Sequence, residues 1–194
     1  ARDTTILETA HGIFGAWRLL HFDKSGLSHF RATRAGFWNS FWVALIALPA
    51  EACMSLLVLT AIPETVAEAG VAHAALVFVF IFAVRWLAYL TVIAEIAGLI
   101  QRSKNFITYA IAYNWSQVVR IVILLPAVTI FAAVGMGGSG WGAAIFYATQ
   151  VAIWVYSWVI ARLALDAPRG AAVGTVVVEI ANATIFALIF NALV

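Results

Sequence analysis

The sequence has few charged residues and almost none of the side chains that build redox, metal or catalytic centres. Asp, Glu, Lys and Arg make up only 10% of its 194 residues, against about 25% in an ordinary soluble domain. There is one cysteine, Cys53, so neither an intramolecular disulfide nor a Cys-x-x-Cys site can form. The sequence also contains no nucleophile-elbow, zinc-protease or phosphate-loop motif. We therefore predict that the protein is not an enzyme and has no catalytic residues.

The four histidines do not supply a metal or cofactor site. His11, His21 and His29 lie in the N-terminal segment, at spacings that do not match the i, i+4 pair of a helical metal site. His73 lies at the end of an apolar stretch and no histidine lies deep in one, so haem lacks its usual axial ligand. The formal net charge of +2 is too small for nucleic-acid binding. We expect no metal, no cofactor and no nucleic-acid partner.

Hydrophobic residues, in contrast, make up 64% of the chain, and the mean hydropathy is +1.00. A transmembrane helix needs about 20 consecutive, mostly apolar residues. Five stretches of the sequence reach that length. They predict an all-α fold, a polytopic transmembrane helical bundle whose immediate partner is the lipid bilayer. The expected spans are 38–62, 73–100, 105–134, 142–165 and 171–194.

The segment before the first span, residues 1–37, is predicted to be an N-terminal arm attached to the transmembrane domain, residues 38–194. Between residues 5 and 22, apolar side chains recur at spacings of three, four and seven, which is typical of an amphipathic helix. We expect this helix to lie in the membrane interface, where an aromatic residue such as Trp17 beside Arg18 is favoured. These two residues are also the candidate docking face for a partner protein.

Charges in the connections predict the topology. The N-terminal arm and the second loop, with Arg102 and Lys104, are basic, whereas the first loop carries Glu64 and Glu68 and no basic residue. Under the positive-inside rule this alternation places the N-terminus in the cytoplasm. An odd number of spans then places the C-terminus outside. We expect the protein to be integral to a bacterial-type inner membrane.

Several polar and charged side chains nevertheless lie within the apolar stretches, where an unpaired charge is costly. At 1.5 Å per residue, Glu51 and Arg85 lie about 20 and 22 Å from the same membrane edge, so we predict that they pair in the bundle interior. Glu179 is expected to bond to Asn114 or to pair with Arg162. The candidate intramembrane polar network is Glu51, Arg85, Glu95, Asn114, Gln117, Arg120, Gln150, Glu179 and Asn182.

Glu95 lies near the cytoplasmic edge, and we expect it to reach Lys104 or Arg162. Two tryptophans of the fourth span, Trp154 and Trp158, are one helical turn apart. They are predicted to form a packing face against another membrane subunit or a second copy of the chain.

The layout resembles the Yip1-like group of small integral membrane proteins, which combine a cytoplasmic N-terminal arm with five closely connected spans. Sequence echoes of uncharacterised bacterial proteins of this kind lie at residues 36–42 (GFWNSFW) and 109–117 (YAIAYNWSQ). The resemblance implies a role in membrane organisation and partner binding, although this arm is shorter than in eukaryotic members and lacks their long acidic or proline-rich regions. It transfers no functional residue.

Two functions are compatible with these features. In the first, the charges fix helix register and the protein is a non-enzymatic scaffold or accessory subunit that binds protein partners or lipid. In the second, a buried glutamate is a protonatable site of a small transporter or channel. A lipid-modifying enzyme is a third, more distant hypothesis, because only the arm and a few loop residues supply polar groups at the interface: Arg102, Lys104, Asp166 and Arg169.

Overall fold

The computed structural model describes residues 2–60, 70–134 and 140–194, and every regular element in these ranges is helical. Five helical segments are long and apolar enough to cross a membrane, which confirms the all-α, five-span prediction. The acidic first loop, with Glu64 and Glu68, lies outside the described residues. The α-helices are α1 (Arg2–Leu20), α2 (Arg34–Ser40), α3 (Ala44–Thr60), α4 (Val71–Leu99), α5 (Phe106–Val134), α6 (Trp141–Leu163) and α7 (Arg169–Leu193), and the 3₁₀ helices are η1 (Lys24–His29), η2 (Phe41–Val43) and η3 (Ser103–Asn105).

The first span begins earlier than its hydrophobicity indicates. Its helical path starts with α2 at Arg34 rather than at residue 38, and it passes through the 3₁₀ turn η2 into α3. Thr33 caps the start, because its Oγ1 accepts a hydrogen bond of 3.1 Å from the backbone N–H of Gly36. A capping threonine satisfies an otherwise unpaired amide at a helix start. A local polar contact, which a hydropathy pattern does not report, therefore sets the boundary.

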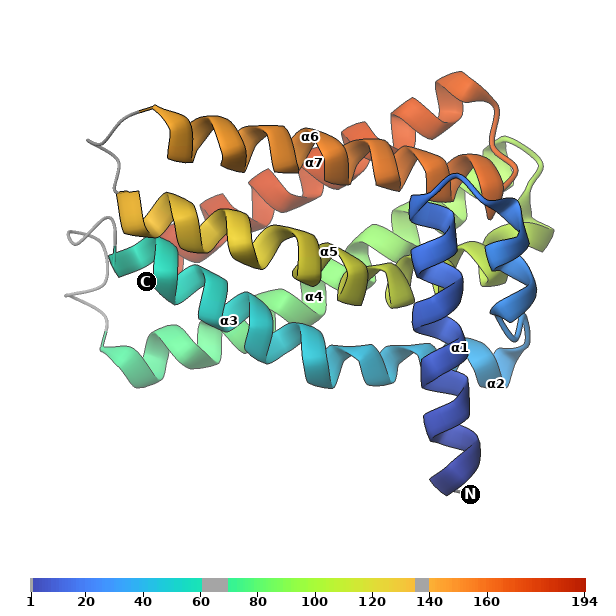
Figure 1. Cartoon of the computed structure of the whole chain (residues 1–194), viewed down its shortest axis with the longest axis horizontal. Coiled ribbons are helices and arrows are strands. Elements are labelled where there is room, and N and C mark those ends of the chain that lie inside the picture. The colour runs from blue at the N-terminus through green and yellow to red at the C-terminus, as the bar shows by residue number, and fades with distance from the viewer. Residues whose placement is uncertain (1, 61–69, 135–139) are drawn as a thin grey trace.

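Consecutive spans run antiparallel to one another, and the packing order of the spans differs from their order in the chain (Figure 1). Helix α5 packs mainly against α3 and α6, whereas α7 packs against α4 and α6. The first and second spans, α3 and α4, touch only weakly although they are consecutive. We call the end of the bundle that carries the N-terminal arm the arm end, and the opposite end the far end.

The tightly packed core lies toward the arm end. Its largest fully buried side chains include Tyr89 on α4, Tyr109 on α5 and Tyr156 on α6. Outside this core, α7 in particular leaves most of its apolar side chains exposed, among them Val177 and Leu188. Such surfaces suit a bilayer, because lipid tails are as apolar as the side chains that face them.

Helix α1 lies across the spans rather than along them, near the arm end (Figure 1). It packs against α5, α6 and η1. The face that it turns inward consists of small residues and one leucine, at i, i+3, i+4 and i+7: Gly12, Gly15, Ala16 and Leu19. Phe14 and Trp17, two further apolar residues of this helix, are 49% and 46% exposed. The arm helix therefore has small residues on its inner face and exposed aromatic residues outside that face.

Candidate functional site

The first ion pair of the polar layer joins Glu51 on α3 to Arg85 on α4. This is the pairing that depth matching along the sequence predicts. The two side chains are 26% and 32% exposed, so the pair is half-buried. Asn182 of α7 donates a hydrogen bond of 3.2 Å to the backbone carbonyl of Arg85. Three helices therefore meet at this pair.

A second and deeper ion pair joins Arg120 on α5 to Glu179 on α7. Their side chains are only 10% and 14% exposed. Arg120 also donates from Nη2 to Ser157 Oγ of α6 at 2.8 Å, and its Cζ lies 4.9 Å from the ring centre of Tyr113. A cation over an aromatic face in a dry environment is favourable. The guanidinium of Arg120 is thus held by three separate groups.

The prediction that Glu179 bonds to Asn114 or pairs with Arg162 is wrong. Asn114 is fully buried, but its partners lie on α4 and α2. Its Oδ1 accepts from Trp86 Nε1 at 2.9 Å, and its Nδ2 donates to Ser40 Oγ at 2.8 Å. Arg162 donates instead to the backbone carbonyl of Ala167 in the α6–α7 turn. Matching residues by depth alone failed because it ignores the direction in which each helix face points.

The remaining members of the predicted network contribute less. Gln117 donates from Nε2 to the carbonyl of Tyr113 in its own helix, at 3.3 Å. Glu95 is exposed, and the ion pairs within the described ranges do not include it, so the expected contacts with Lys104 or Arg162 are not formed. Gln150 has a buried Oε1 atom with no hydrogen-bond partner among the described residues.

Tyrosines that the sequence did not single out lie beside the second ion pair. The ring of Tyr113 faces the guanidinium of Arg120. Its ring lies 4.6 Å from that of Tyr89, whose hydroxyl is 2.7 Å from the hydroxyl of Tyr109. One sequence signal was available, since Tyr109 and Tyr113 are one helical turn apart and therefore share a face. Three aromatic rings thus extend the cluster around Arg120 and Glu179.

The junction between the arm and the bundle is equally specific. Tyr156 of α6 donates from its hydroxyl to the carbonyl of Ala16 at 2.7 Å, and both residues are buried. Asn39 Nδ2 of α2 donates to Glu8 Oε2 of α1 at 2.8 Å. Trp115 of α5 is only 4% exposed and lies under α1. These contacts make the arm part of the folded body.

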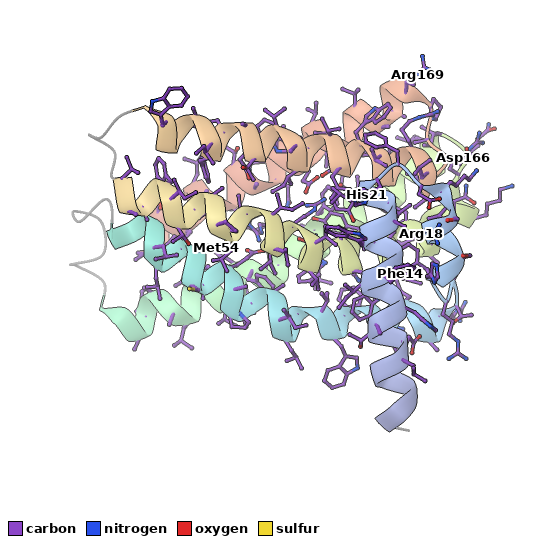
Figure 2. All side chains as sticks on the ribbon, viewed as in Figure 1. Phe14, Arg18, His21, Met54, Asp166 and Arg169 are labelled. Atoms are coloured by element: carbon purple, nitrogen blue, oxygen red, sulfur yellow. The ribbon has the colours of Figure 1, made fainter. Side chains whose placement is uncertain are left out.

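The candidate docking residues occupy different environments. Arg18 forms an ion pair of 2.6 Å with Asp23, so its charge is already partnered, and it lies beside Phe14 and His21 on the outer side of α1 (Figure 2). Trp154 and Trp158 are both partly buried. Trp158 packs against the core, with Arg162 Cζ 6.0 Å from its ring centre. Of the four candidates, Trp17 is therefore the most open to contact from outside.

Asp23 is the acidic residue that fixes the turn after α1. The backbone N–H and hydroxyl of Ser25 donate to its Oδ1 at 2.9 and 2.7 Å, and Arg18 donates to its Oδ2 at 2.7 Å. These hydrogen bonds, those from Ser25 first, lower the pKa of Asp23 to about 2 because they stabilise the ionised carboxylate. The turn is therefore held by a carboxylate at any physiological pH.

Within the described ranges, no group of three His, Cys, Asp or Glu side chains is placed to hold a metal ion. Comparison of the chain with family models, curated proteins and solved structures gave no match.

Proposed function

We propose that this protein is a non-enzymatic integral membrane scaffold or accessory subunit, of Yip1-like layout. One observation supports this proposal above the others: the charged residues deepest in the spans neutralise one another in two ion pairs. Glu51–Arg85 joins α3 to α4, and Arg120–Glu179 joins α5 to α7. Apart from these pairs, α3 and α4 touch weakly, and α5 and α7 are not packed neighbours. The ion pairs therefore join helices that have little apolar contact with each other.

The arm is the part of the molecule proposed to bind partners. It is fastened to the bundle by its inner face, while Leu7, Phe14 and Trp17 remain exposed. An aromatic, apolar face on a helix that lies across the spans suits the membrane interface or a protein that sits there. A rigid arm presents this face in one fixed orientation. That is what a docking platform requires.

The distribution of positive charge supports a cytoplasmic N-terminus. Of the 11 Lys and Arg residues, all but Arg85 and Arg120 belong to the arm or lie at the arm end of the bundle. Arg169, for example, lies at this end, as does Asp166 (Figure 2). Under the positive-inside rule the arm end faces the cytoplasm, here of a bacterial-type inner membrane. A reporter that is active only outside the cytoplasm, fused after Val194, tests this, because inactivity of that fusion contradicts the proposed orientation.

The decisive experiment is purification of the tagged protein from its native membrane in mild detergent, with mass spectrometry of the proteins and lipids that stay bound. The proposal expects a stoichiometric protein partner. A Trp17→Ala variant should lose that partner, whereas Trp141→Ala, at an exposed residue of the far end, should keep it. A chain recovered alone, or only as a homo-oligomer, contradicts the accessory-subunit role.

A small transporter or channel is the second candidate, and one observation favours it. Only one carboxylate oxygen of Glu179 is paired, while Oε2 is buried without a hydrogen-bond partner among the described residues. A buried carboxylate with a free oxygen can accept a proton. This function predicts that Glu179→Gln stops ion flux in reconstituted vesicles while Glu95→Gln does not. No flux from the native protein at any imposed gradient contradicts it.

A further inference from the structure

Four buried polar side-chain atoms have no hydrogen-bond partner among the described residues. One, Glu8 Oε1, lies on the arm helix α1, and the other three lie on different spans: Arg120 Nε on α5, Gln150 Oε1 on α6 and Glu179 Oε2 on α7. Arg120 is only 8% exposed as a residue. Leaving a buried donor or acceptor unpaired is costly, and the cost is greater for charged groups. Because several such atoms lie in one bundle, we expect them to form hydrogen bonds with a group other than a protein side chain.

Two of these atoms belong to the same ion pair. Arg120 Nη1 bonds to Glu179 Oε1, so the free Nε and the free Oε2 are each two covalent bonds from a paired atom. The free Nε–H needs a hydrogen-bond acceptor, and the free Oε2 needs a donor. Water serves as either partner, because it both donates and accepts hydrogen bonds. A cation is disfavoured by Arg120 and an anion by Glu179, so the neutral pair selects a neutral guest.

Gln150 extends this site along α6. It precedes Ser157 by seven residues, so both lie on the same helix face, and Ser157 already contacts Arg120. At 1.5 Å per residue, Gln150 is about 10 Å nearer the far end. Its unpaired oxygen marks a second position at which water satisfies a buried acceptor. A buried water typically makes two to four hydrogen bonds, and the Gln150 oxygen would supply one of them.

We propose that bound water among α5, α6 and α7 forms hydrogen bonds with Arg120 Nε, with Glu179 Oε2 and with Gln150 Oε1. The second ion pair is then a hydrated site inside the membrane. Hydration is compatible with a scaffold, because bound water completes the hydrogen bonds of a structural ion pair. It does not depend on a transport function.

Hydroxyl-radical footprinting of the native protein in lipid nanodiscs tests this directly, because radicals formed from internal water oxidise the side chains beside it. Tyr113 lies against Arg120, and Trp86 is a matched control that is equally buried, each being 9% exposed, but is bonded to Asn114. Hydration predicts that Tyr113 is oxidised several-fold faster than Trp86 once each rate is divided by the intrinsic reactivity of its ring. A normalised rate at Tyr113 no higher than at Trp86 overturns the proposal.

A stability measurement gives a second, independent readout at Gln150. If Oε1 is hydrated, Gln150→Leu removes hydrogen bonds to water and lowers the apparent Tm by a few degrees. If it is dry, the same change removes an unpaired polar group and raises the apparent Tm, which overturns hydration at this position. Val151→Leu, at the neighbouring exposed residue, controls for adding a leucine to α6.

Discussion

Gly12 of α1 lies directly against the indole ring of Trp115 of α5. A methyl group at Gly12 would lie 2.5 Å from atoms of that ring, which is closer than real side chains approach. Trp115 is itself only 4% exposed, so its ring cannot easily move aside in the packed interior. The contact fixes how closely the arm approaches the spans. It also makes the arm the most directly testable part of the fold.

We expect Gly12→Ala to push α1 away from the bundle. Overpacking of this kind costs about 1–3 kcal/mol of the free energy of unfolding, and the arm should become sensitive to protease. Gly174→Ala on α7 is the control, because a Cβ there meets nothing within 4 Å. Alanine favours a helix over glycine by about 1 kcal/mol, so this control should be neutral or stabilising. A Gly12→Ala arm that resists protease like the native one would contradict the packing.

Tyr156→Phe should weaken the same junction through a hydrogen bond. The change removes the hydroxyl that donates to the carbonyl of Ala16 and leaves that carbonyl buried. We expect a loss of about 1 kcal/mol in the free energy of unfolding. The control is Tyr147→Phe, because Tyr147 lies on the same helix but is 65% exposed. Equal stability of the two variants would show that the Tyr156 hydroxyl does not hold the arm.

The two ion pairs should differ in strength according to their burial. Glu179→Gln leaves the Arg120 charge uncompensated where it is most buried, and we expect a loss of about 3–5 kcal/mol. Glu51→Gln should cost less, roughly 1–3 kcal/mol, because that pair is more exposed. Exposed Glu95→Gln should change little. Unfolding in mixed detergent measures all three, and a larger loss for Glu51→Gln than for Glu179→Gln would reverse the expected order.

The turn after α1 should respond to acid. The pKa of Asp23 is lowered to about 2 in the fold, from an ordinary value of 3.8. A lowered pKa stabilises the fold above the unfolded value, so this contribution is complete above about pH 4 and is lost as the pH falls toward 2. A carboxyl NMR titration should show the shift. Ser25→Ala should move the pKa of Asp23 upward, because Ser25 supplies the strongest of its hydrogen bonds, and an unchanged pKa would contradict that cause.

The extent to which the sequence predicts the polar layer differs between its two ion pairs. Glu51 and Arg85 were identified as a pair because their depths agree and their spans are consecutive in the chain. Arg120 and Glu179 were each recognised as candidates, but not as partners. They lie 59 residues apart, on helices that are neither consecutive nor packed neighbours. Which non-consecutive helices face each other depends on packing, and a depth estimate contains no such information.

For the arm, too, the sequence predicts some features and the packing decides others. Apolar spacing predicts the helix, and Trp17 on its outer side is consistent with an interfacial role. The contact face, however, is built from Gly12 and Ala16, which a hydrophobicity pattern scores as weak. Small residues matter here because they let two backbones approach closely, and that is visible only when the partner surface is known.

The sequence by itself determined that this protein has five membrane spans, a helical arm and a set of charges that need partners inside the membrane. These features follow from local properties, since the length of an apolar run and the cost of burying a charge do not depend on the rest of the fold. Only the tertiary structure decided that Arg120 pairs with Glu179, that Asn114 forms hydrogen bonds with Trp86 and Ser40, and that α1 packs on Trp115. The physical reason is that hydrogen bonds and close packing depend on direction, which is set when helices distant in the chain come together.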